Sequence, residues 1–361
     1  MAHTHRRTVS DRLKVVLVAS IVTAWLVPQT GHASGVSWQS LSLDEALALA
    51  AQDGSEVLVD VYTTWCGPCQ QLDAEVFPTD SVGSATDDLI AIRLNAEEGE
   101  GPAIVERYHV VGYPTVLLLQ PDGVEIDRIF GFMPADEFAS TVDGYQLGTG
   151  TIAQLRDQVA AEPTNLDLVY ELGYRSAIRG ETDQAITRLT QVIEVDADNG
   201  LGLRSQAHFV LGKYLYLRGA GDTTAALEQF AIIMDQFPSS PEASQVPFQN
   251  AIALCRSGDE TAAREAFEAI LAAEPDNVDA YNTVAWTCYR ESFQLGWGLE
   301  VAQRGLEIDA TSHSLWDTYA ELQNASGDVQ GAIESTQQAM TLDPDEAYYQ
   351  RQLERFQSLL E

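Results

Sequence analysis

The strongest constraint on the fold of this chain is a pair of cysteines directly after a run of apolar residues. Cys66 and Cys69 lie within Trp-Cys-Gly-Pro-Cys at positions 65–69, and residues 57–62 read Val-Leu-Val-Asp-Val-Tyr. This order predicts a buried strand that leads into a helix whose first turn carries both thiols. There the helix macrodipole favours the thiolate of Cys66. Because a thiolate is the species that attacks disulfides, the pattern indicates thiol–disulfide chemistry.

The charge of the chain excludes one large class of partners. The 361 residues include 54 acidic and 20 basic side chains, and only two of the basic ones are lysines, Lys14 and Lys213. Such a surface repels phosphate backbones and anionic lipid headgroups, so we do not expect the protein to bind nucleic acid. The excess of acidic residues is otherwise typical of a highly soluble protein or of one from a salty habitat. The alternative explanation is that the negative surface steers the protein toward a basic partner.

The first 33 residues have the pattern of a targeting segment. Basic residues precede an apolar run from Val15 to Val27, and the small residues Gly31-His32-Ala33 follow. The run of about 13 residues is shorter than the roughly 20 that a membrane-spanning helix needs. We therefore predict a signal peptide at residues 1–33, cleaved near Ala33, and a periplasmic or secreted protein. An uncleaved N-terminal membrane anchor is the alternative.

Residues 34–147 alternate between strand and helix patterns. This alternation predicts an α/β domain in which helices flank a central mixed sheet. We expect a first helix at 44–52, strands at 57–62, 89–94, 115–119 and 124–130, and further helices at 66–76, 102–108 and 134–145.

Beyond residue 148 the patterns are helical and recur about every 34 residues, the period of the tetratricopeptide repeat (TPR). Small residues return at similar offsets, as Leu172-Gly173 and Leu211-Gly212 show. Because such units cannot bury their apolar faces alone, stacking is obligatory and predicts an all-α solenoid. We expect a linker and leading helix at 148–164, about five TPR repeats at 165–344 and a capping helix at 345–361.

Three separated features of residues 34–147 resemble the thioredoxin-fold family. They are the Trp-Cys-Gly-Pro-Cys motif, Asp60 six residues before Cys66, and Gly112-Tyr113-Pro114-Thr115 before a strand. The resemblance implies that Pro114 is cis and faces the active-site disulfide. It also implies that the backbone beside Pro114 pairs with a substrate peptide, so Tyr113 and Thr115 are expected to contact that peptide.

The same resemblance implies roles around the cysteines. Cys66 would be the exposed attacking thiol with a lowered pKa, and Cys69 would resolve the mixed disulfide. A buried Asp60 would assist the deprotonation of Cys69, Trp65 would shield the dithiol from water, and Arg93 falls where many relatives carry a lysine near the buried acid. A zinc site is the rival interpretation of two such cysteines, but neither a second pair nor a nearby His-x-x-His motif is present. We therefore expect no metal and no cofactor.

One departure from the family pattern refines the expected function. Ordinary thioredoxins carry a proline five residues after the second cysteine, where this chain has Ala74. The sequence there is more similar to the exported branch of the family, and Gly-Pro between the cysteines resembles reducing members. We expect an exported thiol–disulfide oxidoreductase that reduces client proteins and receives electrons from a membrane partner protein. The alternatives are an oxidase, isomerase or chaperone on the same scaffold, or a non-enzymatic TPR scaffold that senses redox state.

The first helices of the repeats predict a concave face that binds a client peptide. Such a groove would hold an extended or helical peptide, with its basic residues engaging an acidic or C-terminal group. The alternative is that several of the aromatic residues belong to the core between helices. The candidate residues are Tyr170, Tyr174, Phe209, Lys213, Tyr216, Phe248, Arg256, Trp286, Tyr289 and Arg290.

The two remaining cysteines, Cys255 and Cys288, fall on the first helices of consecutive repeats. Neighbouring first helices usually keep their Cα atoms beyond the roughly 7 Å that a disulfide permits. We therefore expect both to be buried, small apolar residues, and a structural bridge between them is the alternative.

Overall fold

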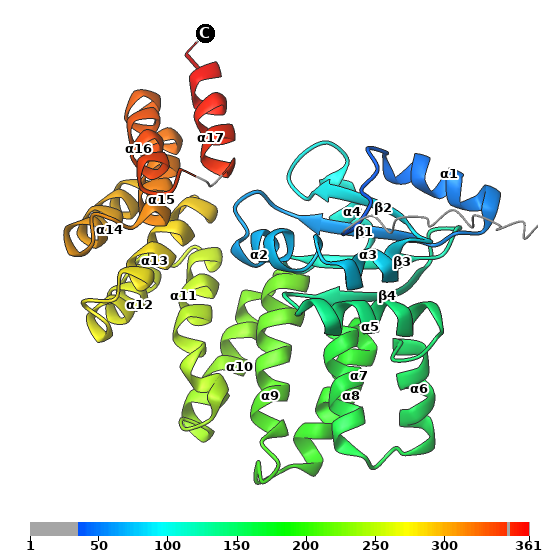
Figure 1. The fold of residues 1–361 in the computed structure, drawn as a ribbon. Coiled ribbons are helices and arrows are strands. Elements are labelled where there is room, and N and C mark those ends of the chain that lie inside the picture. The colour runs from blue at the N-terminus through cyan, green and yellow to red at the C-terminus, as the bar shows by residue number, and fades with distance from the viewer. Residues whose placement is uncertain (1–34, 345–346, 361) are drawn as a thin grey trace, which may run out of the picture. The chain divides into compact units, whose positions relative to one another are not determined.

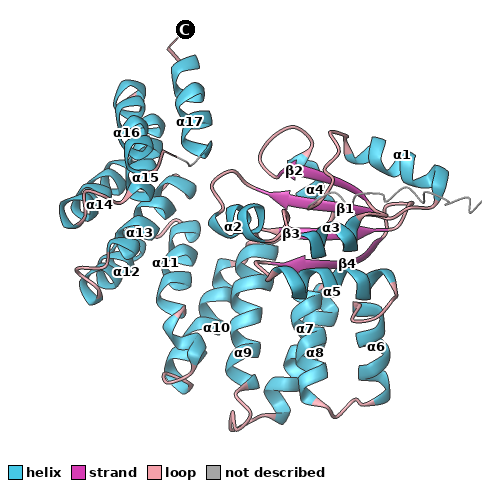
Figure 2. Ribbon diagram, in the orientation of Figure 1, coloured by secondary structure: helices cyan, strands magenta, loops and turns pink. Residues whose placement is uncertain are grey.

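The computed structural model describes residues 35–344 and 347–360. The predicted signal peptide, and the first two residues and the last residue of the predicted capping helix, lie outside the described residues. Within these ranges a four-stranded α/β domain is followed by successive pairs of helices (Figures 1 and 2), which confirms the predicted fold class. None of the described helices is both long enough and apolar enough to cross a membrane.

The sheet is mixed, as the strand and helix patterns predicted. Strand β1 (Val57–Tyr62) pairs parallel with β2 (Ile90–Asn95) and antiparallel with β3 (Thr115–Leu119), which pairs antiparallel with β4 (Glu125–Phe130). The strand order is therefore β2-β1-β3-β4. The two central strands, β1 and β3, are almost entirely buried, because helices cover both faces of the sheet.

Alternate residues of β1 enter two different cores. Val57, Val59 and Val61 belong to the core that includes residues of α1 and α4, whereas Leu58 belongs to the core that includes residues of α2, α3 and α5. Asp60 follows Leu58 by two residues and so lies on the α2 face. The helices of this domain are α1 (Leu43–Asp53), α2 (Gly67–Glu75), α3 (Asp80–Thr86), α4 (Gly101–Arg107) and α5 (Ala135–Gln146).

Helix pairs follow the α/β domain, and small residues allow them to pack closely. A Cβ atom on Gly173 would lie 2.8 Å from the Leu189 side chain, and one on Gly212 would lie 2.6 Å from the Phe230 ring. The helices are α6 (Ile152–Ala161), α7 (Leu166–Ala177), α8 (Thr182–Val195), α9 (Leu203–Val210), α10 (Thr223–Gln236), α11 (Val246–Ser257), α12 (Glu260–Ala273), α13 (Val278–Arg290), α14 (Leu295–Ile308), α15 (His313–Ala325), α16 (Val329–Leu342) and α17 (Ala347–Ser358).

Two segments depart from regular α-helix. A 3₁₀ helix, η2 (Pro241–Ser244), precedes α11, and a π-helix, η1 (Leu211–Ala220), continues directly from α9. A π-helix forms hydrogen bonds between residues five apart rather than four. Side chains in η1 therefore do not follow the α-helical spacing of the other repeats, whose alignment predicted the concave face.

A buried carboxylate joins β4 to the first helices of the repeat region. Asp127 has no exposed surface, and it forms ion pairs with Arg175 of α7 and with Arg179 just after that helix. It also accepts a hydrogen bond from the backbone N–H of Ile152, the first residue of α6. Beside it, Arg128 donates to the carbonyl of Ile178 at 2.8 Å. We call these groups the Asp127 cluster.

We predict that Asp127→Ala lowers the free energy of unfolding by about 3–5 kcal/mol, because Arg175 and Arg179 would keep their charges without this buried partner. Equilibrium unfolding in urea measures the change. The matched control is Asp157→Ala, which removes an exposed aspartate of α6 and should change stability by less than about 0.5 kcal/mol. Equal losses in the two variants would contradict the prediction.

Candidate redox site

The two cysteines of the motif form a disulfide at the start of α2. Their Cα atoms are 5.2 Å apart, and Cys66 is the N-cap residue, whose sulfur accepts the backbone N–H of Cys69 at 3.2 Å. Pro68 occupies the first turn, where its missing N–H removes no helical hydrogen bond. When the bond is reduced, the N–H donor and the helix dipole both favour a thiolate at Cys66.

Cys66 is not exposed, contrary to our expectation. Its exposed fraction is 4%, although Gly67 and Pro68 between the two cysteines are open to solvent. The sulfur is bonded to Cys69, which is itself buried inside the first turn of α2. In addition, the preceding residue, Trp65, is covered by side chains of the repeat region.

Trp65 connects the dithiol loop to α13. Its ring lies 5.6 Å from that of Trp286, and the Arg290 guanidinium lies 4.2 Å from its ring centroid. The indole N–H donates to a carboxylate oxygen of Glu97 at 2.8 Å, and Glu97 also forms an ion pair with Arg290. Trp65 further packs against an apolar cluster that contains Tyr348 of α17. The repeat region thus covers one side of the redox loop.

The loop before β3 faces Trp65. The Tyr113–Pro114 peptide bond is cis, and the Tyr113 ring lies 6.1 Å from the Trp65 ring. Thr115 is fully buried and its hydroxyl donates to the carbonyl of Gly112 at 2.8 Å, so its side chain is not accessible to a peptide here. Tyr113 lines an open cleft together with Gly112 of the same loop.

Asp60 lies buried under α2 and is paired with Arg93. The two residues are direct partners across β1 and β2, and Nε of Arg93 lies 2.9 Å from Oδ2 of Asp60. Arg93 also contacts Asp73 of α2 at 2.7 Å and stacks on the Tyr62 ring. The other oxygen, Oδ1 of Asp60, has no hydrogen-bond partner among the described residues. Burial raises the pKa of Asp60 to about 6, and the Arg93 charge opposes that rise only in part.

The aromatic residues predicted for the groove do not share one surface in the structure. Phe209 and Phe248 pack between helices, 6.5 Å from Phe230 and 6.2 Å from Phe267 respectively. Tyr170, Tyr174 and Tyr216 pack, partly buried, against one apolar core of the repeats. These five aromatic residues therefore follow the alternative interpretation, in which they belong to the core between helices.

The basic residues of the predicted groove also have partners within the chain. Lys213 lies over the Phe209 and Tyr214 rings, where burial lowers its pKa to about 8. Arg256 forms a two-pronged pair with Glu291, with contacts of 2.7 and 2.9 Å. Tyr289 packs on Trp286, and burial raises its pKa to about 12. Trp286 and Arg290 contact the α/β domain itself.

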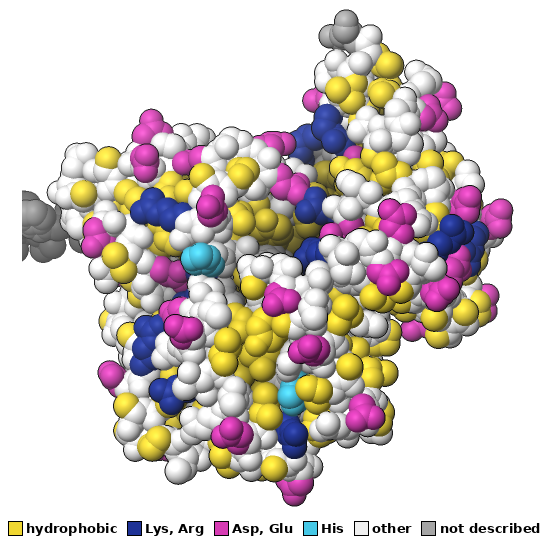
Figure 3. All heavy atoms as spheres, turned by 180° about the vertical axis from the view of Figure 1, so that it is seen from behind, with side chains coloured by type: hydrophobic (Ala, Val, Ile, Leu, Met, Phe, Trp, Pro, Cys, Tyr) yellow, Lys and Arg dark blue, Asp and Glu magenta, His cyan; other side chains and the backbone are white. Residues whose placement is uncertain are grey.

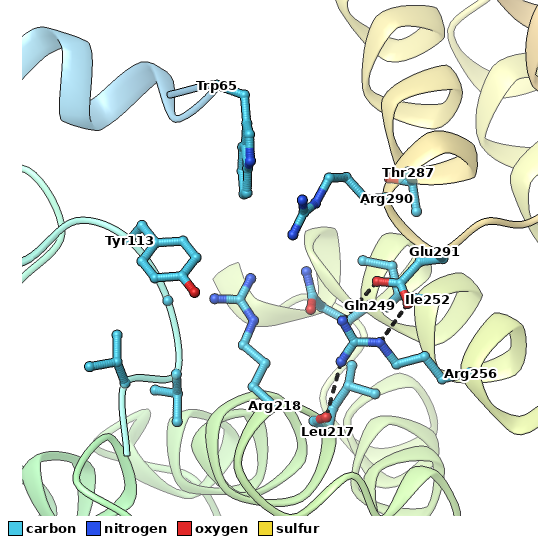
Figure 4. Close-up of a pocket in the computed structure, with 13 residues that line it drawn as sticks. Trp65, Tyr113, Leu217, Arg218, Gln249, Ile252, Arg256, Thr287, Arg290 and Glu291 are labelled. Carbon is cyan, nitrogen blue, oxygen red and sulfur yellow. Dashed lines mark hydrogen bonds and ion pairs between the residues drawn. The ribbon is translucent and has the colours of Figure 1, made fainter. Parts of the chain in front are cut away.

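A cleft of about 380 Å³ lies where the α/β domain meets the repeats. Trp65 and Tyr113 line one side, and Arg218, Arg256 and Arg290 line the other (Figure 4). Seen from the face opposite to Figure 1, the surface is hollowed and hydrophobic side chains gather there (Figure 3). Arg218 was not among the residues predicted from the sequence; it lies in η1, whose π-helical spacing differs from that of the α-helical repeats.

The other two cysteines are not bonded to each other, as predicted. Cys288 is fully buried and Cys255 is half-buried. Burial raises the pKa of Cys255 to about 11 and that of Cys288 to about 12, so both thiols are unreactive near neutral pH. In the described part of the chain, no group of three or more His, Cys, Asp or Glu residues is placed to hold a metal ion.

Comparison with known families divides the chain as the structure does. Residues 43–146 match the thioredoxin-like domain, and residues 146–229 match the tetratricopeptide repeat. The chain therefore carries a thioredoxin-like domain followed by a TPR domain.

Relatives of known function match the first of these domains. The thiol:disulfide interchange protein DsbD of Pseudoalteromonas atlantica is 31% identical over 101 residues, which are 27% of this chain and 17% of that protein. DsbD of Cronobacter sakazakii is 33% identical over 102 residues, again 27% and 17% of the two chains. The chain thus spans about a sixth of the length of these relatives.

Solved structures resemble each domain separately. A thioredoxin from Thermus thermophilus is 28% identical with a TM-score of 0.29, over 32% of this chain and 91% of that one. The oxidised C-terminal domain of DsbD from Neisseria meningitidis is 24% identical with a TM-score of 0.27, over 30% and 98%. YrrB, a TPR protein with an unusual peptide-binding site, is 11% identical with a TM-score of 0.35, over 55% and 96%.

The pKa of Asp60 makes stability depend on pH. Between about pH 4 and 6 the unfolded chain ionises this residue while the folded protein keeps it protonated, so the free energy of unfolding falls as pH rises. A pKa raised from 3.8 to about 6 corresponds to a loss of about 3 kcal/mol across that window. We predict that Asp60→Asn removes this fall. Urea unfolding of the oxidised protein at several pH values measures it, with Asp157→Asn as the control, and an unchanged pH slope in Asp60→Asn would refute the assignment.

Removal of the Trp286 ring should uncover the redox loop. We predict that in reduced Trp286→Ala the Cys66 thiol is alkylated about two- to tenfold faster than in the wild type, because an aromatic contact of Trp65 is lost. Mass spectrometry of the labelled protein measures the rate. Tyr319→Ala, which removes an aromatic residue of α15, is the control and should leave the rate unchanged. A rate that stays at the wild-type value in Trp286→Ala would show that the contact of α13 with Trp65 does not limit access to Cys66.

Proposed function

We propose that this protein is an exported thiol–disulfide oxidoreductase that reduces disulfides of client proteins. The observation that carries the proposal is the Cys66–Cys69 disulfide at a helix N-terminus, next to the loop with cis Pro114 and above the buried Asp60. Export is supported by the leader pattern of residues 1–33. The similarity of residues 43–146 to thiol:disulfide interchange proteins supports the type of reaction.

The reaction requires two successive exchanges of sulfur bonds. The Cys66 thiolate attacks one sulfur of the client disulfide, and the second client sulfur leaves as a thiolate and takes a proton from water. Asp60 accepts the proton of the Cys69 thiol, a role that suits a carboxylate with a pKa of about 6. The Cys69 thiolate then attacks Cys66, which forms the internal disulfide and releases the reduced client. A membrane partner protein returns two electrons to the pair.

One observation favours a second candidate function. Cys66 is only 4% exposed, and Trp65 is held by Trp286 and Arg290. A dithiol covered in this way suits a TPR assembly scaffold whose disulfide reports redox state, since such a role does not require turnover. An oxidase or isomerase on the same scaffold would differ from a reductase in the reduction potential of the pair.

Insulin reduction in the presence of dithiothreitol separates these candidates. We predict turnover by the wild type, background rates for Cys66→Ser, and wild-type rates for the control Cys255→Ser. Cys69→Ser should retain clients as mixed disulfides with Cys66, because the resolving thiol is missing. Mass spectrometry after expression in the native host identifies these clients. If the wild type shows neither turnover nor trapped clients in Cys69→Ser, the redox-sensing scaffold is the better account.

A further inference from the structure

Three arginine side chains converge on the cleft beside the redox loop. Arg218 comes from η1, Arg256 from α11 and Arg290 from α13 (Figure 4). Glu291 is the acidic residue among those that line this cleft in the described part of the chain. The lining is therefore basic, although the chain as a whole has 54 acidic and 20 basic residues.

Within the described residues, Arg218 differs from the other two arginines in having no carboxylate partner. Arg256 is paired with Glu291, and Arg290 is paired with Glu97. Within the described residues, Arg218 has neither an ion pair nor a hydrogen bond, and its charge lies over the Tyr214 ring at 5.7 Å. Its side chain is exposed within the cleft. The surrounding protein nevertheless removes part of its hydration, and this loss together with the nearby Arg256 charge lowers the pKa of Arg218. An added carboxylate would give this guanidinium the two-pronged partner that Arg256 already has.

Arg218 lies beside the loop before β3, which a bound client peptide would contact. Its guanidinium lies near Gly112, where a Cβ atom would come within 3.1 Å of Nη1. The next residue, Tyr113, lies outside β3, and its backbone N–H and carbonyl have no hydrogen-bond partner within the described residues. An extended peptide that pairs with this backbone would pass along the cleft. Its side chains near the reacting cysteine would then be within reach of Arg218.

We propose that Arg218 binds a carboxylate of the client segment that carries the reacting cysteine, so that the enzyme prefers acidic peptides. This inference rests on the proposed function of the Cys66–Cys69 pair. The carboxylate belongs either to an aspartate or glutamate side chain or to the C-terminus of the client. Arg256 and Arg290 contribute positive potential, while their existing ion pairs hold them in place.

A rate measurement with synthetic peptides tests the proposal. Each short alanine-based peptide carries one cysteine, activated with an uncharged thiopyridyl group, and glutamate, glutamine or lysine at one neighbouring position. Attack by Cys66 in the full-length Cys69→Ser background forms the mixed disulfide and releases thiopyridone, whose absorbance gives the rate. Peptides with free and amidated C-termini distinguish the two sources of the carboxylate.

We expect one or more acidic peptides to react about tenfold faster than their neutral counterparts, as a hydrogen-bonded ion pair would provide. Arg218→Gln should abolish this ratio. Arg264→Gln should preserve it, because Arg264 is also exposed and stacked on an aromatic ring, Trp297, but lies on α12 outside the cleft. Arg218→Glu should reverse the preference toward lysine peptides, a gain that misfolding cannot produce.

Two results would overturn the proposal. One is equal reaction of acidic and neutral peptides at every position and with both C-termini, and the other is a preference that Arg218→Gln retains. Failure of the proposed function is distinguishable, since the wild type would then fail to reduce insulin whichever peptides react with Cys66.

Discussion

The arrangement of this molecule depends on the burial of one carboxylate, Asp127, between strand β4 and the first helices of the repeat region. Charged groups removed from water are tolerated only when each has its partners, so a cluster of this kind is either complete or strongly destabilising. Here two arginines, a backbone N–H of α6 and the neighbouring Arg128 complete it. The first repeat is therefore fixed to the sheet by contacts with demanding geometry.

The position of the later repeats follows from that of the first one. In a solenoid each helix pair packs on its neighbours, so the orientation set at α7 is carried along the stack. The stack brings α13 against the redox loop, where Trp286 and Arg290 contact Trp65. Two consequences result. One face of Trp65, beside the Cys66–Cys69 disulfide, is covered, and a basic cleft forms next to Tyr113.

Much of the α/β domain could be predicted because its signals are local. The apolar run of β1, the cysteines at the start of α2 and the turn before β3 each lie within a few residues. The family resemblance placed Arg93 near Asp60, and the structure pairs the two residues across β1 and β2. The missed helix, α3, contains only seven residues with a central glycine, so it carries little periodic signal.

The features that the sequence did not predict depend on distant residues or on unusual helix geometry. Glu97 and Arg290 are 193 positions apart, and nothing near either residue indicates the other. Asp127 and Arg175 have the residue types of an ordinary surface, and only the docking of α7 on β4 buries them. Arg218 was not predicted, and nothing in the sequence shows that Leu211–Ala220 is a π-helix.

The central claim is that the Asp127 cluster makes the thioredoxin-like domain and the first repeats a single cooperative unit. Hydrogen exchange monitored by mass spectrometry at increasing urea concentration tests it most directly. We predict that peptides from β3, β4, α7 and α8 lose their protection together, with one free energy of opening. Loss of protection in α7 and α8 at a clearly lower urea concentration than in the sheet would contradict the account.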